Sequence, residues 1–173
     1  EQGYNTLVED AGLIADALVI SSSKDEHWDA SAKEVITALL LYLAFDPIPF
    51  TDNLPNLRRI LRNDVNLTKV MNELAKSDQL DGILSGLAQS YLSKPDKEQA
   101  SVLSTARRQT QFLDFDAMQR VLSGHDFDLN ELRNNKTTIY LCLPAMRMGT
   151  CNRWLRLFIN LVLAAMEDST APK

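Results

Sequence analysis

Residues 137–143, Thr-Thr-Ile-Tyr-Leu-Cys-Leu, have the composition of a β-strand in a chain whose other patterned segments predict helices. The run is almost continuously apolar, rich in β-branched and aromatic residues, and is stopped by Pro144. Such a run is typical of a strand buried on both faces of a parallel sheet. Because each unpaired buried backbone group costs about 1–3 kcal/mol, one strand cannot be buried alone. The sequence therefore predicts a sheet whose other strands lie outside these 173 residues.

The rest of the chain predicts a mainly α protein. Apolar residues recur at helical spacing over residues 1–124, which we interpret as a multi-helix all-α domain. Residues 125–173 are expected to form a partial return into an α/β domain, with a strand at about 137–143 and a helix at about 150–167. The helices expected in the first part cover about 5–20, 26–45, a short stretch after 53, 67–76, 80–92, a helix starting at 93–96, and 116–122. The final helix is expected to turn six residues inward: Leu155, Phe158, Ile159, Val162, Leu163 and Met166.

Composition and charge limit the function. The longest apolar run, residues 38–45, is far shorter than the roughly 20 residues of a membrane span. The net charge is −5, and residues 1–53 carry ten acidic and two basic residues. Such a surface repels a phosphate backbone and favours a basic protein partner, and the more ordinary interpretation is a solvated acidic face without a partner. Asp25, Glu26 and Asp29 are the acidic residues that we select as candidates for partner docking.

One compact basic cluster stands against this acidic background. Arg58, Arg59 and Arg62 lie on one short predicted helix, and Arg58 and Arg62 are one turn apart. They are candidates for docking either DNA phosphate or an acidic protein tail. The alternative is a solvated helix with ordinary ion pairs.

The sequence offers no catalytic or metal-binding constellation. Neither His27 nor His125 has a second His or Cys at ligand spacing. Asp114 and Asp116 precede a short predicted helix and are expected to cap it. The two cysteines, Cys142 and Cys151, suggest a reducing compartment and not a disulfide framework.

The sequence also contains no nucleotide-binding motif. None of the six glycines is followed by Lys, so the phosphate-binding motif G-x-x-x-x-G-K-[S/T] does not occur. We therefore expect this segment to have no cofactor and no enzymatic activity of its own.

The order of several short motifs resembles a known family. These are Phe-Leu-Asp at 112–114, Asp-Phe-Asp-Leu at 126–129, Thr-Thr-Ile-Tyr-Leu-x-Leu-Pro at 137–144 and Trp-Leu-Arg-Leu at 154–157. Together with LIADALV and HWDASAKEVITALLLYLA nearer the start, they resemble the TraG-like coupling proteins of type IV secretion and conjugation. The likeness is weaker between residues 46 and 100.

The resemblance implies a fold and a role. Family members are hexameric, membrane-anchored ATPases with a RecA-like motor that uses ATP and Mg²⁺ on the cytoplasmic side of the bacterial inner membrane. An all-α domain inserted in the motor helps to select relaxase–DNA complexes or effector proteins. By this likeness, the chain is a substrate-recruitment domain followed by one strand and one helix of the RecA-like core, with possible DNA contact in the full assembly. The isolated segment is then a monomer or a dimer paired through the strand.

Two other functions remain open. A small helical DNA-binding module would use the Arg58, Arg59 and Arg62 helix. A free-standing helical adaptor unrelated to secretion would need a second copy to pair with the strand.

Overall fold

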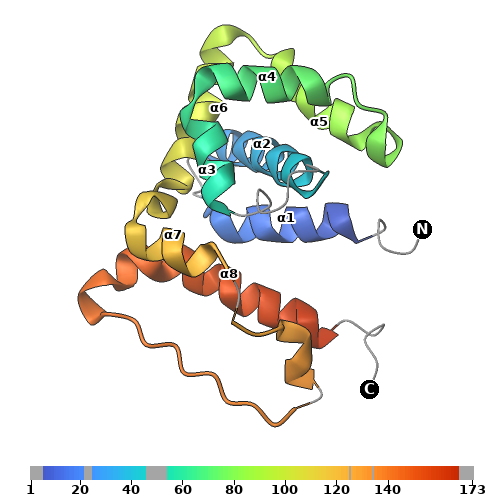
Figure 1. The fold of residues 1–173 in the computed structure, drawn as a ribbon. Helices are drawn as coiled ribbons and strands as arrows, with labels where there is room; N and C mark the ends of the chain where they lie inside the picture. Colours follow the sequence, from blue (N-terminus) through green and yellow to red (C-terminus); the bar gives the residue numbers. More distant parts are fainter. Residues whose placement is uncertain (1–5, 22–24, 46–53, 125, 134, 168–173) are drawn as a thin grey trace.

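The computed structural model describes residues 6–21, 25–45, 54–124, 126–133 and 135–167 (Figure 1). Within these ranges the protein is mainly helical and contains no β-strand. The α-helices are α1 (Leu7–Leu18), α2 (Glu26–Phe45), α3 (Leu54–Arg62), α4 (Asp64–Leu74), α5 (Ile83–Leu92), α6 (Asp96–Gln109), α7 (Asp116–Leu122) and α8 (Met148–Glu167). Four short 3₁₀ helices connect them: η1 (Gln79–Gly82), η2 (Gln111–Asp114), η3 (Leu129–Arg133) and η4 (Ala145–Arg147).

Helix α2 is the centre of the core. It packs against α1, α6, α5, α3 and α4, and Figure 1 shows it running between α1 and the α4–α5 pair. Its apolar side chains recur at the helical period, so Ile36 and Leu39 are both fully buried. Burial of each such side chain contributes about 1.5–3 kcal/mol. The helical pattern of the sequence predicted the bounds of α2 and α7 correctly.

The α4–α5 connection departs from the predicted helix at 80–92. Leu80 and Asp81 have φ values of 54° and 52°, and Gly82 has a φ of 83°. Non-glycine residues enter the left-handed region only at a cost, so the chain cannot continue as an α-helix here. Helix α5 consequently begins at Ile83.

Helix α8 lies against α1 and the 3₁₀ helices η2 and η3. Cys151 and Leu157 are buried there. Ile159, Leu163 and Met166 are instead 46%, 55% and 49% exposed, so their predicted inward position is wrong for the chain by itself. No described element covers that side of α8, although the sequence gives it the apolar pattern of a buried face.

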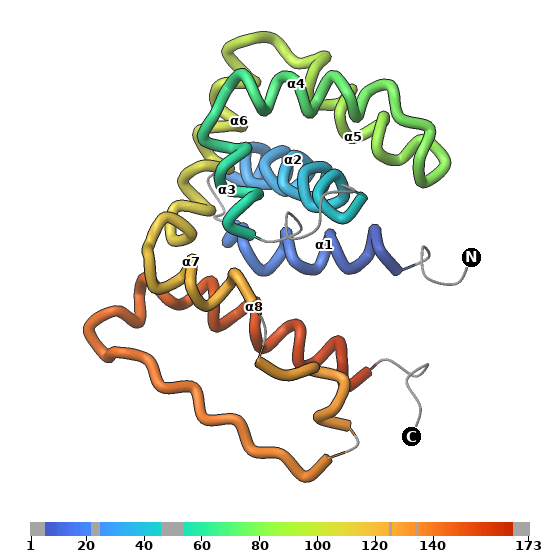
Figure 2. The backbone as a smooth tube through the Cα atoms, in the orientation of Figure 1, coloured from blue at the N-terminus to red at the C-terminus, as the bar shows by residue number. Residues whose placement is uncertain are grey.

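The predicted strand at 137–143 is not formed among the described residues. The chain from 136 to 144 has no regular secondary structure, and Figure 2 shows it running as a long extended stretch before α8. Tyr140 is 83% exposed and Leu141 38% exposed, whereas Leu143 packs partly against the core. A strand needs a hydrogen-bonded neighbour, and none is present in the described part of the chain. Pairing with strands outside these residues, and membership of a RecA-like core, stay predictions.

Candidate functional site

The predicted basic cluster on α3 divides into one buried and two exposed arginines. Arg58 is only 8% exposed and faces η2. Its Nε donates to Oδ1 of Asp114 at 2.9 Å and its Nη2 to Oδ2 at 2.5 Å, which is a two-pronged ion pair. Its Nη1 donates to the carbonyl of Arg107 at 2.8 Å and to Oγ1 of Thr110 at 3.1 Å. Arg58 therefore joins α3 to α6 and η2 and is not available for docking.

Asp114 has a different role from the one predicted. The N-cap position of α7 is Phe115, and no side chain caps that helix. The hydrogen bonds from Arg58, reinforced by its charge and by Arg62, lower the pKa of the Asp114 carboxyl against the opposing effect of burial. The carboxylate thus stays charged and holds Arg58 in place.

A second arginine, Arg107, holds α6 against the junction of α3 and α4. Arg107 on α6 donates from Nε to the carbonyl of Leu61 at 2.6 Å, and its Nη2 pairs with Asp64 at the start of α4. Arg107 therefore satisfies a carbonyl at the end of α3, where helical carbonyls lack partners inside the helix.

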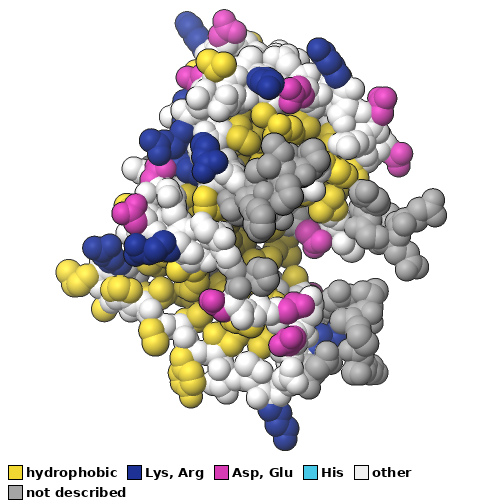
Figure 3. Space-filling view, viewed as in Figure 1, with side chains coloured by type: hydrophobic (Ala, Val, Ile, Leu, Met, Phe, Trp, Pro, Cys, Tyr) yellow, Lys and Arg dark blue, Asp and Glu magenta, His cyan; other side chains and the backbone are white. Residues whose placement is uncertain are grey.

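Arg59 and Arg62 remain at the surface, and basic side chains gather over α3 in Figure 3. The Arg62 side chain is 63% exposed, and its Nη1 reaches Asp114 Oδ1 at 3.3 Å. Both arginines border a polar hollow of about 360 Å³, which we call the arginine hollow. Its lining is Pro55, Arg58, Arg59, Arg62, Asn63, Asp114 and Gln119.

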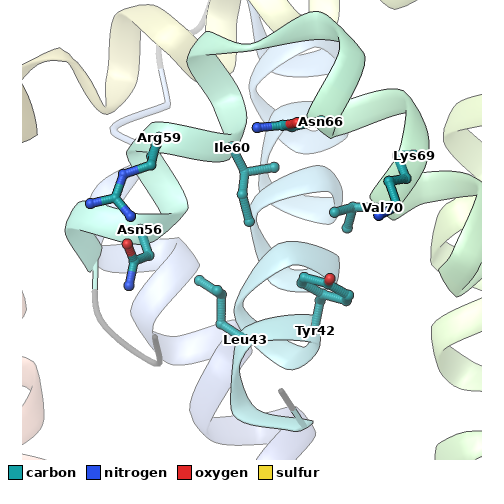
Figure 4. A pocket seen from close by; sticks show the side chains of 8 residues that line it. All are labelled: Tyr42, Leu43, Asn56, Arg59, Ile60, Asn66, Lys69 and Val70. Carbon is teal, nitrogen blue, oxygen red and sulfur yellow. The ribbon is translucent and has the colours of Figure 1, made fainter. Parts of the chain in front are cut away.

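Arg59 also borders a smaller hollow of about 230 Å³ between α2, α3 and α4. In Figure 4, Leu43, Ile60 and Val70 form the apolar part of its lining, with Arg59 on the α3 side and Lys69 on the α4 side. Arg59 thus separates one amphipathic hollow from one polar hollow.

The predicted acidic docking residues are not equivalent. Asp29 is 1% exposed, and its Oδ1 accepts a hydrogen bond from Nε2 of Gln109 at 3.0 Å. It is a core residue and presents no carboxylate to a partner. Asp25 is half-buried and has interactions of its own, whereas Glu26 is exposed. Of the three, Glu26 is the residue best placed to contact a partner.

The Gln109 side chain of α6 contacts α2, α8 and the segment just after α1. Besides Asp29, its Nε2 donates to the carbonyl of Ile20 at 3.0 Å, just beyond α1. Its Oε1 accepts from Nη2 of Arg153 on α8 at 2.7 Å. Desolvation, and to a smaller extent the charge of Arg108, lower the Arg153 pKa. The side chain of Gln109, itself 4% exposed, therefore links α8 to the helical core.

Sequence reasoning missed both Gln109 and Asp114 as structural partners. Gln109 sits at the end of a helix among polar residues, and nothing in the pattern separates it from a solvated Gln. The signal for Asp114 was its position after Phe112-Leu113, both of which are buried. Asp114 is itself partly shielded from water, so its carboxylate needs a partner, and Arg58 is that partner.

An apolar hollow of about 360 Å³ lies between α7, α8 and the extended stretch. Ile139, Tyr140 and Leu141 form one side of it, and Trp154 and Phe158 of α8 form another. The Trp154 and Phe158 rings stack at 5.7 Å. Figure 3 shows apolar side chains gathered in this part of the molecule.

The described residues contain no group of three or more potential metal ligands. His27 Nε2 lies 3.3 Å from Oε1 of Glu98, which is an ordinary surface contact. Among the described helices, none has the length and hydropathy needed to cross a membrane.

Comparison with known proteins identifies the family. The family model for type IV secretory system conjugative DNA transfer matches residues 1–172. The type IV secretion system-coupling proteins VirD4 of Bartonella quintana (strain Toulouse) and Bartonella henselae (strain ATCC 49882) are each 28% identical to the chain over 155 residues. Each alignment covers 84% of this chain and 23% of the relative, so the chain spans about a quarter of each protein's length. No solved structure matches the chain significantly. Because the family model covers almost every residue, the chain belongs to the type IV secretory system conjugative DNA transfer family.

Proposed function

We propose that this chain is the substrate-recruitment part of a type IV secretion coupling protein. The observation that carries the proposal is the family match over residues 1–172 in a sequence that lacks the phosphate-binding motif. A segment without that motif contributes through its surfaces, and its described part is a helical unit with both acidic and basic exposed side chains. Its cargo would be a relaxase–DNA complex or an effector protein, passed on to the secretion channel.

The C-terminal part of the chain would attach this unit to the motor. Residues 137–143 have unpaired backbone groups, and Ile159, Leu163 and Met166 are exposed apolar side chains on α8. These features support burial against a RecA-like sheet elsewhere in the parent protein. We propose that the parent is a membrane-anchored hexameric ATPase that uses ATP and Mg²⁺ at the cytoplasmic side of a bacterial inner membrane.

The acidic surface of α1 and α2 is the proposed contact for basic cargo segments. Glu9 and Asp10 are exposed in the first turn of α1 and Glu26 is exposed at the start of α2, whereas Asp29 is buried and takes no part. Complementary charges mainly accelerate encounter and select among partners.

The test measures binding of the 173-residue chain to relaxases and to effector proteins of type IV secretion. Reversing charge at Glu9→Lys and Glu26→Lys should weaken binding roughly tenfold, because like charges then face each other. The control reverses two exposed acids elsewhere, Asp78→Lys and Glu131→Lys, and should bind as the unaltered chain does.

Two results would contradict the proposal at different levels. Equal affinities for both variants would reject the acidic contact. Failure of every relaxase and effector to bind the unaltered chain would reject substrate recruitment itself.

A further inference from the structure

We propose that the arginine hollow binds the carboxylates of an acidic segment of a protein partner. This adds a second docking surface, of opposite charge to the acidic surface of α1 and α2. It rests on the proposed function only for the idea that the chain docks proteins.

The floor of the hollow is already electrically balanced. Arg58 donates four hydrogen bonds, to Asp114, Arg107 and Thr110. Both carboxylate oxygens of Asp114 accept from it. Because this pair is neutral and largely buried, it neither attracts nor repels a ligand strongly. Its effect is to hold α3 against η2 so that the surface above keeps its shape.

The charge available to a ligand comes from Arg59 and Arg62. Arg59 is exposed and has no side-chain partner among the described residues. Arg62 makes only the 3.3 Å contact with an Asp114 oxygen that Arg58 already uses. Each guanidinium has five donors in a planar fork that matches a carboxylate, so both retain unused donors directed at solvent or a ligand. Asn63 and Gln119 add neutral amides to the same lining.

The spacing suits two carboxylates and not a polyanion. Arg59 and Arg62 are three positions apart on one helix, which places their Cβ atoms about 5–6 Å from each other. Two carboxylates one helical turn apart on a partner have the same separation. A nucleic acid carries a charge about every 1.7 Å of duplex axis and needs a row of cations. Among the described residues the hollow offers two exposed cations, of which Arg62 also contacts Asp114, and no row of cations, so an acidic protein segment is a better fit than a nucleic acid.

The experiment uses the 173-residue chain and a labelled short helical peptide with two glutamates one turn apart. Fluorescence anisotropy at low salt should show binding that the peptide with glutamines in their place does not show. Arg59→Glu with Arg62→Glu should weaken binding roughly tenfold or more. Arg59→Glu alone leaves Arg62 and its contact with Asp114 in place, so it should weaken peptide binding by a smaller factor. The control Lys76→Glu with Lys97→Glu makes the same charge change at exposed sites outside the hollow and should stay within about twofold.

Three other outcomes would contradict the proposal. Equal weakening in the arginine and lysine variants would mean a diffuse charge effect without a site. Tighter arginine-dependent binding of a single-stranded DNA with the same number of charges would make this a nucleic-acid surface. No peptide binding, with arginine-dependent self-association in sedimentation, would assign the hollow to a second copy of the chain.

The same variants separate this inference from the proposed function. If the arginine variant loses the acidic peptide but retains relaxase or effector binding, both proposals stand on separate surfaces. If the peptide binds through the arginines and no relaxase or effector binds at all, the hollow is real and recruitment is rejected.

Discussion

Replacing Asp114 by Asn tests whether the Arg58 ion pair holds α3 against η2. The change keeps the volume but removes the charge that accepts two hydrogen bonds from a guanidinium only 9% exposed. Removing one partner of a fully buried pair costs about 3–5 kcal/mol. Asp114 is 29% exposed, so water can reach the freed donors, and the amide oxygen of Asn can still accept one bond. We therefore expect the free energy of unfolding to fall by about 2 kcal/mol, each hydrogen bond to a charged group being worth about 1.5–3 kcal/mol.

Urea denaturation followed by circular dichroism measures this loss directly. For a chain of this size, about 2 kcal/mol corresponds to a Tm lower by about 4–8 °C. The matched control is Asp64→Asn, which also removes a carboxylate from an arginine pair, but at a side chain that is 77% exposed. Its expected cost is below about 1 kcal/mol, as for other surface pairs.

The pH dependence gives an independent check on the same pair. The pKa of Asp114 is lowered in the folded protein, chiefly by the hydrogen bonds from Arg58. The stabilisation is therefore fully present above the pKa of an unfolded Asp, about 3.9, and is lost as the pH falls through the lower folded value. The difference in stability between the unaltered chain and Asp114→Asn should shrink in that acidic range. Equal losses for the Asp114 and Asp64 variants at neutral pH would refute the reasoning.

Four further substitutions test other parts of the structure by urea denaturation. Gln109→Ala removes the hydrogen bonds that link α6 to α2, to α8 and to the segment after α1, so the free energy of unfolding should fall by about 3 kcal/mol. A loss below about 1 kcal/mol would contradict this role. Leu39→Ala should cost about 3 kcal/mol through the cavity left in the core, whereas Leu163→Ala, at a side chain 55% exposed, should change stability by less than about 0.5 kcal/mol. Gly82→Ala should cost about 1 kcal/mol because its φ of 83° strains any Cβ, and an unchanged midpoint would show that the η1 turn can relax.

The core helices were predictable because their apolar residues recur at helical spacing and are buried against neighbours within the chain. Helix α2 is the clearest case, since Ile36 and Leu39 belong to one helical series and both are fully buried. The start of α5 was not predictable in this way. The periodicity of residues 80–92 is helical throughout, and only the left-handed backbone at 80–82 separates η1 from α5.

The candidate docking residues were predictable only as a group. Charge counting found the α3 arginines and the acids near the start of α2, but helical spacing does not say which member of a charged group faces inward. Arg58 and Asp29 are buried because Asp114 and Gln109, distant in sequence, complete their hydrogen bonds. Arg59, Arg62 and Glu26 stay exposed. Pairs so far apart in sequence leave no local pattern, so the division between structural and available charges needed the fold.

Helix α2 and the C-terminal part of the chain differ in how far an apolar pattern leads to burial. In α2, the apolar residues that recur at helical spacing are buried, as their pattern predicts. In the stretch 137–143 and on the outer side of α8, the pattern is equally apolar but the side chains of Tyr140 and Leu163 are exposed. Exposed apolar side chains at strand and helix spacing are unfavourable in water, so both patterns agree with the proposal that this surface is covered by a part of the protein outside these residues. Under that proposal Gln109, through Arg153, would tie the covered helix to the other described helices.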